Sequence, residues 1–142
     1  MTDVLHPPAD KGAGVALVDG NAAVRHARQL MLRSEQYDVK SYATCAALLA
    51  DPDSRNYACI ILDVEMEGID GLDLLTRMRA SGWHGRAILL DGLAPESAVT
   101  REVLQNGDRI EERSIGDSSL LSAVAATFRD TTPNITGNST YI

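Results

Sequence analysis

Apolar residues along the chain gather in short blocks that are separated by longer amphipathic stretches. The blocks lie at residues 14–19, 37–42, 57–63, 86–92 and, more weakly, 108–113. Three of them are continuous apolar runs rather than alternating ones: "GVALVD", "YACIILD" and "RAILLDG". Such runs are typical of strands that are covered on both faces. We therefore expect five strands in the interior of the molecule.

Helical patterns fill the intervals between the blocks. Apolar residues recur there at spacings of three and four, which places them on one face of a helix and predicts that this face is buried. Pro95 and Glu96 suit the start of the helix that follows the fourth strand, and Gly107 suits its end. Asp117 or Ser118 can cap the last helix. The expected buried stripes are Val24, Ala27, Leu30 and Met31; Leu72, Leu75 and Met78; Val99, Val103 and Leu104; and Leu120, Val124 and Phe128.

The alternation of strands and helices predicts the fold class. Connections that contain a helix are too long for hairpins, so consecutive strands are expected to be parallel and joined by right-handed crossovers. The result is an α/β fold with a doubly wound, five-stranded parallel sheet. We expect a flexible leader over residues 1–13, one domain over 14–129, and a flexible tail or the start of a linker over 130–142.

Composition excludes several function classes. The chain of 142 residues has a formal net charge of -7, which argues against direct binding of nucleic acid or an anionic membrane. No apolar run approaches the roughly 18 residues of a membrane span, and the N-terminus does not resemble a signal peptide. Cys45 and Cys59 lie in apolar segments without metal-binding spacing, which favours two core thiols in a reducing compartment. We expect a cytoplasmic protein.

Acidic residues mark the ends of three expected strands. Asp19, Asp63 and Asp91 end the first, third and fourth strands, and Arg113 follows the fifth. The carboxyl ends of parallel strands meet at one edge of the sheet, where ligands bind in open α/β folds. One aspartate at such a place is commonly a helix cap, but clustered carboxylates repel each other unless a metal or an arginine compensates. The combination predicts a functional site.

Four segments together resemble the receiver domain of two-component response regulators: "VALVDGNAAVR", "IILDVEMEGIDGLDLLTRMR", "AILLDG" and "EERSI". The resemblance covers residues 14–129, and its most specific part is the loop that follows Asp63. It implies a flavodoxin-like fold with strand order 2-1-3-4-5. It also implies that Asp63 is the phosphoacceptor, whose carboxylate attacks the phosphorus in line and forms a labile acyl phosphate.

The resemblance further implies a Mg²⁺ site beside the acceptor. The family takes its ligands from a pair of acids after the first strand, from the acceptor, and from a backbone carbonyl two residues later. These positions correspond to Asp19, Asp63 and the carbonyl of Glu65, whereas Gly20 stands where the second acid is expected. Because a charged ligand is missing, we expect Mg²⁺ binding to be weak and no other cofactor.

The phosphate-sensing positions also depart from the family pattern. Asp91 replaces the Thr or Ser after the fourth strand, and a carboxylate there repels a phosphoryl group and donates no hydrogen bond to it. Arg113 replaces the lysine after the fifth strand, if one residue is deleted in the preceding loop, and Ser114 replaces the proline that follows. Ile110 takes the place of the switch aromatic, and Glu67 that of the loop proline. We therefore predict a degenerate receiver with weak or absent phosphorylation.

Charge balance leads to a specific hypothesis for Arg113. We expect it to lie between Asp91 and Asp63, where a guanidinium would replace the missing cation. In the alternative, Asp91 only caps the next helix and Arg113 is a surface residue.

Three functional readings remain open beside a phosphorelay receiver without enzymatic activity. The first is a pseudo-receiver that acts as a protein-interaction module without phosphorylation. The second is a phosphatase of the haloacid-dehalogenase type, faintly indicated by "DVE" with Glu65 as general acid. The third is a flavodoxin-like flavin or nucleotide binder, for which the loop after the first strand lacks hydroxyl residues.

The receiver resemblance also implies protein partners. They are a histidine kinase or phosphotransfer protein, and an output partner or second copy. The implied surfaces are the face of the fourth helix, fifth strand and fifth helix, or the face of the first and fifth helices.

Overall fold

The five predicted strands are present and form one parallel sheet. The computed structural model describes residues 14–63, 71–90 and 103–131. The strand order is β2-β1-β3-β4-β5, with every neighbouring pair parallel, so the predicted fold class and strand order are confirmed. The strands are β1 (Gly14–Val18), β2 (Val39–Tyr42), β3 (Tyr57–Asp63), β4 (Arg86–Leu90) and β5 (Arg109–Glu111).

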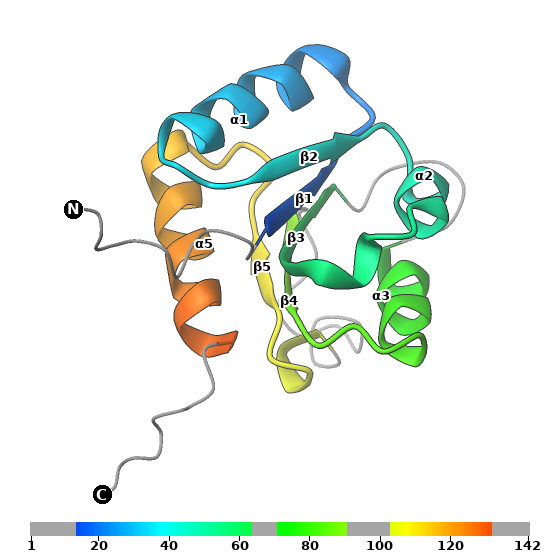
Figure 1. The fold of residues 1–142 in the computed structure, drawn as a ribbon. Helices are drawn as coiled ribbons and strands as arrows, with labels where there is room; N and C mark the ends of the chain where they lie inside the picture. Colours follow the sequence, from blue (N-terminus) through cyan, green and yellow to red (C-terminus); the bar gives the residue numbers. More distant parts are fainter. Residues whose placement is uncertain (1–13, 64–70, 91–102, 132–142) are drawn as a thin grey trace, which may run out of the picture.

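Helices cover both faces of the sheet. The helix α1 (Ala22–Ser34) and the helix α5 (Asp117–Thr131) lie on one face, and α2 (Cys45–Ala50) and α3 (Gly71–Ala80) lie on the other (Figure 1). A short 3-10 turn, η3 (Ser54–Asn56), leads into β3. The strands supply both cores alternately, which explains their continuous apolar runs. For example, Leu17 packs with the α1 and α5 side, and Val18 packs with the α2 and α3 side.

Two of the predicted helix stripes are confirmed. Leu75 and Met78 of α3 are buried, as are Leu120 and Val124 of α5. Leu72 and Phe128 are partly buried and pack against the same cores. These two helices therefore attach to the sheet through apolar contacts, as their sequence spacing predicts.

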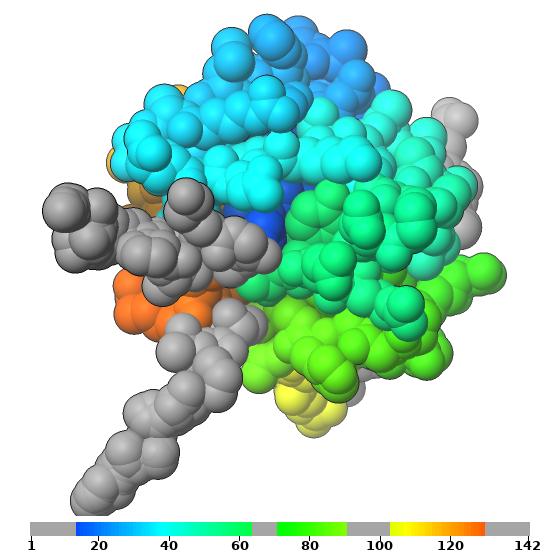
Figure 2. All heavy atoms as spheres, viewed as in Figure 1, coloured from blue at the N-terminus to red at the C-terminus, as the bar shows by residue number. Residues whose placement is uncertain are grey.

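The predicted stripe of α1 is wrong at three of its four positions, since only Met31 is partly buried and packs against the core. Val24 is 38% exposed and Leu30 is 53% exposed, and the helix lies at the upper edge of the molecule in the space-filling view (Figure 2). Ala27 is exposed too, whereas Leu32 is fully buried. The reason is that α1 begins beside the carboxyl end of β1, and its arginines provide hydrogen-bond donors to backbone carbonyls and face the buried carboxylate of Asp19.

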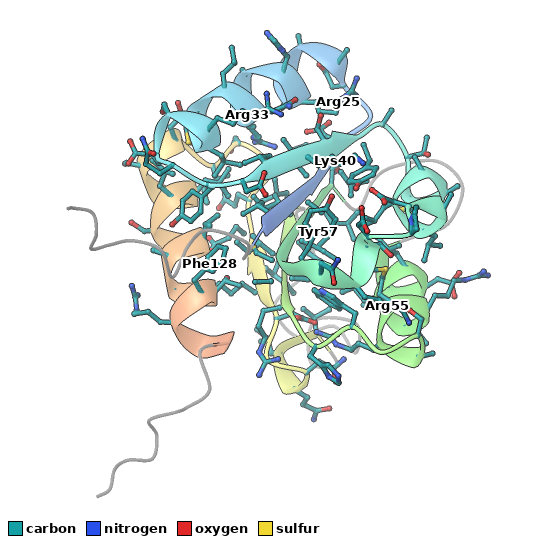
Figure 3. The ribbon with its side chains drawn as sticks, viewed as in Figure 1. Arg25, Arg33, Lys40, Arg55, Tyr57 and Phe128 are labelled. Carbon is teal, nitrogen blue, oxygen red and sulfur yellow. The ribbon has the colours of Figure 1, made fainter. Side chains whose placement is uncertain are left out.

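Arginines supply those donors from the inner side of α1. Arg25 and Arg33 lie between α1 and β2 (Figure 3). Arg33 donates from Nη2 to the carbonyl of Val39 at 3.1 Å, and Arg25 donates to the carbonyl of Asp19 at 2.7 Å. Long arginine side chains also cover apolar surface with their stems. The side of α1 that faces the sheet therefore combines these polar contacts with the apolar contacts of Leu32 and Met31.

The third predicted stripe is only partly described. Val103 is buried, but Leu104 is 55% exposed, so the prediction for Leu104 is wrong. Val103 takes the inward position in this last helical turn, and its neighbour consequently faces outward. Gly107 follows with a φ of 85°, a left-handed conformation that glycine adopts without strain and that ends a helix. Pro95, Glu96 and Val99 lie outside the described residues.

The ends of the domain and the two cysteines complete the comparison with the sequence. The predicted leader 1–13 and most of the predicted tail 130–142 lie outside the described residues, while α5 continues to Thr131. Cys45 and Cys59 are buried thiols that form no disulfide, as predicted, and burial raises the pKa of Cys59 to about 12. Across the described ranges, no helix combines the length and the apolarity that a membrane span needs.

Candidate functional site

Asp19 lies immediately after β1 and is almost completely buried, with an exposed fraction of 2%. Its Oδ1 accepts the backbone N–H of Asn21 at 2.9 Å. Asn21 in turn caps α1, because its side chain accepts the N–H of Val24 at 3.0 Å. The carboxylate is therefore held by the turn that joins β1 to α1.

The second oxygen of Asp19 faces an arginine of α1. Arg28 Nη1 lies 3.4 Å from Asp19 Oδ2, and the two side chains are 11% and 3% exposed. The other nitrogen of this guanidinium, Nη2, donates to the backbone carbonyl of Arg113 at 2.8 Å. Arg28 thus joins the end of β1 to the segment that follows β5.

Asp63 is the last residue of β3, and Arg113 reaches it from beyond the end of β5. Arg113 Nε and Nη2 lie 3.2 Å and 3.1 Å from the same oxygen, Asp63 Oδ1. The Asp63 side chain is 16% exposed and that of Arg113 is 40% exposed. The structure therefore brings together Asp63 and Arg113, as the charge-balance hypothesis requires. Its other half, a contact with Asp91, lies outside the described residues, as do the carbonyl of Glu65 and the side chain of Glu67.

Gly20 lies directly after Asp19, in the turn between β1 and α1. At Gly20, the nearest atom to an added Cβ would be the carbonyl oxygen of Ala43 at 4.0 Å. Packing therefore does not require a glycine, and an acidic side chain has room to begin there. Ile110 lies in β5 and is partly buried against the core formed with α2 and α3.

Arg28 was missed by the sequence-based interpretation. Arg25 and Arg28 are spaced by three residues, so they lie on one face of α1. This helix begins only three residues after Asp19. That proximity was a usable signal. The sequence analysis considered only the charged residues at the strand ends and not those on the helices.

The described residues do not fit a Mg²⁺ site as they stand. Among them, no group of three or more Asp, Glu, His or Cys side chains is arranged to hold a metal. Mg²⁺ requires oxygen ligands in near-octahedral geometry. Here Asp19 Oδ2 and Asp63 Oδ1 each lie beside a guanidinium instead. The formal charges of these two acids and two arginines cancel.

Comparison with known families identifies the chain. Its residues 15–109 match the family described as the response regulator receiver domain. The chain belongs to this family. The predicted resemblance is thereby confirmed, and the match ends before Arg113.

Curated relatives of this receiver domain are regulatory proteins. It is 29% identical over 112 residues to the transcriptional regulatory protein FixJ of Azorhizobium caulinodans, covering 79% of this chain and 53% of the relative. It is 26% identical over 112 residues to the transcriptional regulatory protein TdiR of Thauera aromatica, covering 79% and 49%. The chain thus spans about half the length of the curated relatives it matches.

Solved structures show the same fold. Full-length FixJ from B. japonicum superposes with a TM-score of 0.73 at 25% identity, covering 87% of this chain and 60% of that one. The chemotaxis protein CheY4 of Vibrio cholerae gives a TM-score of 0.70 at 22% identity, covering 81% and 98%. The second likeness supports the fold alone.

Proposed function

We propose that this receiver domain works as a protein-interaction module in two-component signalling whose binding does not depend on phosphorylation of Asp63. The domain has no enzymatic role in this proposal. Its partners are a histidine kinase or phosphotransfer protein, and an output protein or a second copy of the chain. Both cysteines are buried thiols outside any disulfide, in keeping with a reducing, cytoplasmic setting.

The observation that carries the proposal is the contact between Arg113 and Asp63. A phosphoacceptor carboxylate needs an accessible oxygen for in-line attack on phosphorus. Here Oδ1 of Asp63 accepts contacts from two nitrogens of one guanidinium, at 3.1 Å and 3.2 Å. The arginine therefore provides in the resting domain the positive charge beside Asp63 that Mg²⁺ would otherwise supply.

The missing acid at Gly20 supports the same proposal. Phosphoryl transfer to a receiver relies on a divalent cation to neutralise the converging oxygens. With a glycine at this position one acidic ligand is missing, and the charge of Asp19 is paired with Arg28. We expect weak Mg²⁺ binding as a result.

A conventional phosphorelay receiver is the second candidate. It is favoured by the place of Asp63 at the end of β3 and by the 40% exposure of Arg113, which gives this side chain a route into solvent. In that case Arg113 would leave Asp63 and contact the phosphoryl group instead.

Intact-mass spectrometry after incubation with Mg²⁺ and acetyl phosphate separates the two candidates. We expect no stoichiometric phosphoryl adduct on the wild type. An adduct that forms on the wild type and is lost in Asp63→Asn would overturn the proposal and establish the second candidate.

Gly20→Asp serves as the matched gain-of-function variant. The space around Gly20 admits an added Cβ, and a carboxylate at this position would restore a metal ligand, so the adduct fraction should rise above that of the wild type. An unchanged fraction would contradict the role given to the missing acid.

Spectroscopy provides a test that does not rely on turnover. Beryllofluoride with Mg²⁺ mimics the phosphorylated aspartate. Amide spectra of the wild type should remain unchanged when both are added, and a partner that binds the wild type should bind Asp63→Asn with the same affinity. Chemical-shift changes that extend over β5 would count against the proposal.

A further inference from the structure

The strongest unassigned feature is the guanidinium of Arg28, which lies between the ends of β1 and β5. We propose that Arg28 is a positioning residue that replaces a divalent cation at Asp19 and holds Arg113 against Asp63. This inference deepens the function proposed above and concerns the same site.

Burial gives the first reason. The side chain of Arg28 is only 11% exposed and that of Asp19 only 3%. A charge removed from water is costly unless it is paired and hydrogen-bonded. The guanidinium satisfies this requirement through the carboxylate of Asp19 and the backbone carbonyl of Arg113. These two contacts determine its position.

The fork of the guanidinium gives the second reason. Nη1 meets Asp19 Oδ2 at 3.4 Å, and Nη2 donates to the carbonyl of Arg113 at 2.8 Å. A planar guanidinium makes both contacts at once, whereas a lysine ammonium is a point charge on a flexible stem. Arg28 therefore ties the backbone of Arg113 to the end of β1.

The position of that backbone determines where the Arg113 side chain begins. With its carbonyl held by Arg28, Arg113 extends to Asp63 with Nε at 3.2 Å and Nη2 at 3.1 Å. Arg28 of α1 therefore contacts both the end of β1 and the segment after β5. That segment contacts the end of β3 through the side chain of Arg113. Loss of Arg28 should therefore loosen a contact that Arg28 does not itself make.

Charge explains why this arrangement excludes a metal. A divalent cation at Asp19 would lie within a few ångströms of a fixed positive charge, which would repel it. It would also compete for Oδ2, which already faces Arg28. Removing the charge of Arg28 while keeping its length should therefore admit a cation.

Mn²⁺ binding, followed by the electron paramagnetic resonance signal of the free ion, tests this. Wild type, Arg28→Gln, Arg28→Lys and Arg33→Gln are titrated with Mn²⁺ alone. Arg33 is a matched control because it lies on the same helix and donates to a backbone carbonyl, that of Val39, away from the site. We expect Arg28→Gln to bind Mn²⁺ about tenfold more tightly than the wild type, and the other two variants to behave like the wild type.

Amide hydrogen exchange over residues 113–116 tests the fork separately. Exchange should be faster in both Arg28 variants, because neither glutamine nor lysine reproduces the two contacts, and unchanged in Arg33→Gln. Adding Asp19→Asn to Arg28→Gln should abolish the gain in Mn²⁺ binding. Circular dichroism checks folding, and if Arg28→Gln does not fold, Arg28→Lys still has to show faster exchange without tighter metal binding.

The inference is overturned if the wild type already binds Mn²⁺ as tightly as Arg28→Gln, or if exchange after β5 is the same in all variants. Neither readout uses phosphorylation. Phosphorylation of Asp63 in the wild type would therefore refute the proposed function without affecting the comparison between the Arg28 variants and the wild type. Unchanged Mn²⁺ binding and amide exchange in those variants would refute only the role of Arg28.

Discussion

The two ends of the sheet each carry an aspartate–arginine pair, but the pairs are built differently. At the end where the strands begin, Arg79 of α3 holds Asp108, the residue before β5. At the end where the strands finish, Arg113 holds Asp63. The residue types are the same, so their surroundings account for the difference.

The pair at the beginning of the strands is complete. Arg79 Nη1 and Nη2 contact different oxygens of Asp108, at 2.9 Å and 2.8 Å. Asp108 also accepts the backbone N–H of Ala87 at 2.9 Å, and its side chain is fully buried. The guanidinium carbon of Arg79 lies 5.0 Å from the ring centroid of Trp83. This pair joins α3, β4 and β5 as part of the core.

The pair at the finishing end is open by comparison. Two nitrogens of Arg113, Nε and Nη2, contact the same oxygen of Asp63, and the arginine side chain is 40% exposed. Exposed ion pairs contribute little to stability, because water and salt screen them. A fully paired aspartate thus fixes a structure, whereas a partly exposed one stays available for exchange of its partner.

The largest effect should come from breaking the complete pair. In Asp108→Asn the carboxylate charge is lost, and Arg79 keeps its cation without a counterion. We expect the free energy of unfolding to fall by about 3 kcal/mol, as for other buried pairs that lose one partner. Urea denaturation followed by the fluorescence of Trp83 measures it.

An exposed pair on the same helix is the control. Asp73 and Arg77 contact at 2.9 Å with side chains 45% and 58% exposed, so Asp73→Asn should change the free energy of unfolding by less than about 0.5 kcal/mol. Equal losses in the two variants would show that burial does not distinguish these pairs.

A smaller effect is expected at the open pair. Asp63→Asn removes a contact that is partly screened, so the free energy of unfolding should change by less than about 1 kcal/mol. Added salt should reduce even this difference. Urea denaturation of the wild type and Asp63→Asn at low and high salt measures this difference in the free energy of unfolding. A loss as large as that of Asp108→Asn would mean that Arg113 and Asp63 are a structural pair after all.

The smallest effect concerns a third aspartate, away from both pairs. A hydrogen bond from Tyr42, followed by those from the Asp53 backbone and Lys40, lowers the pKa of Asp51 to about 2. Because the folded pKa lies below the unfolded value of about 3.9, the stabilisation is present above pH 4 and is lost as the pH falls towards 2. Tyr42→Phe should raise the pKa of Asp51 towards its ordinary value, measured by carbon-13 NMR titration. An unchanged pKa would assign the shift to the other two donors.

Much of the fold could be predicted from the sequence because parallel strands leave a direct trace. Runs such as Ile60–Leu62 must be apolar on both faces, so they differ visibly from helices and loops. The stripes of α3 and α5 were also predictable, since these helices attach through apolar contacts. Arg113 could be placed near Asp63 because both follow strands that end at one edge.

The failures have a common physical cause. Val24 and Leu30 were assigned to the core because apolar residues are expected to face inward, but α1 covers buried polar groups, and its arginines face them instead. The link from Arg28 to Arg113 joins residues far apart in the chain and ends on a backbone carbonyl, which every residue possesses. Side-chain identity therefore carries no signal of that bond.

The polar attachment of α1 also limits how the helix can move. Arg25, Arg28 and Arg33 donate to carbonyls of three separate segments, those of Asp19, Arg113 and Val39. Apolar side chains can slide past one another and pack again, but a hydrogen bond tolerates only a narrow range of distance and angle. A shift of α1 along its axis by one turn, about 5.4 Å, would break all three bonds together. The axial register of α1 is consequently fixed, and a displacement on partner binding should arise in other elements.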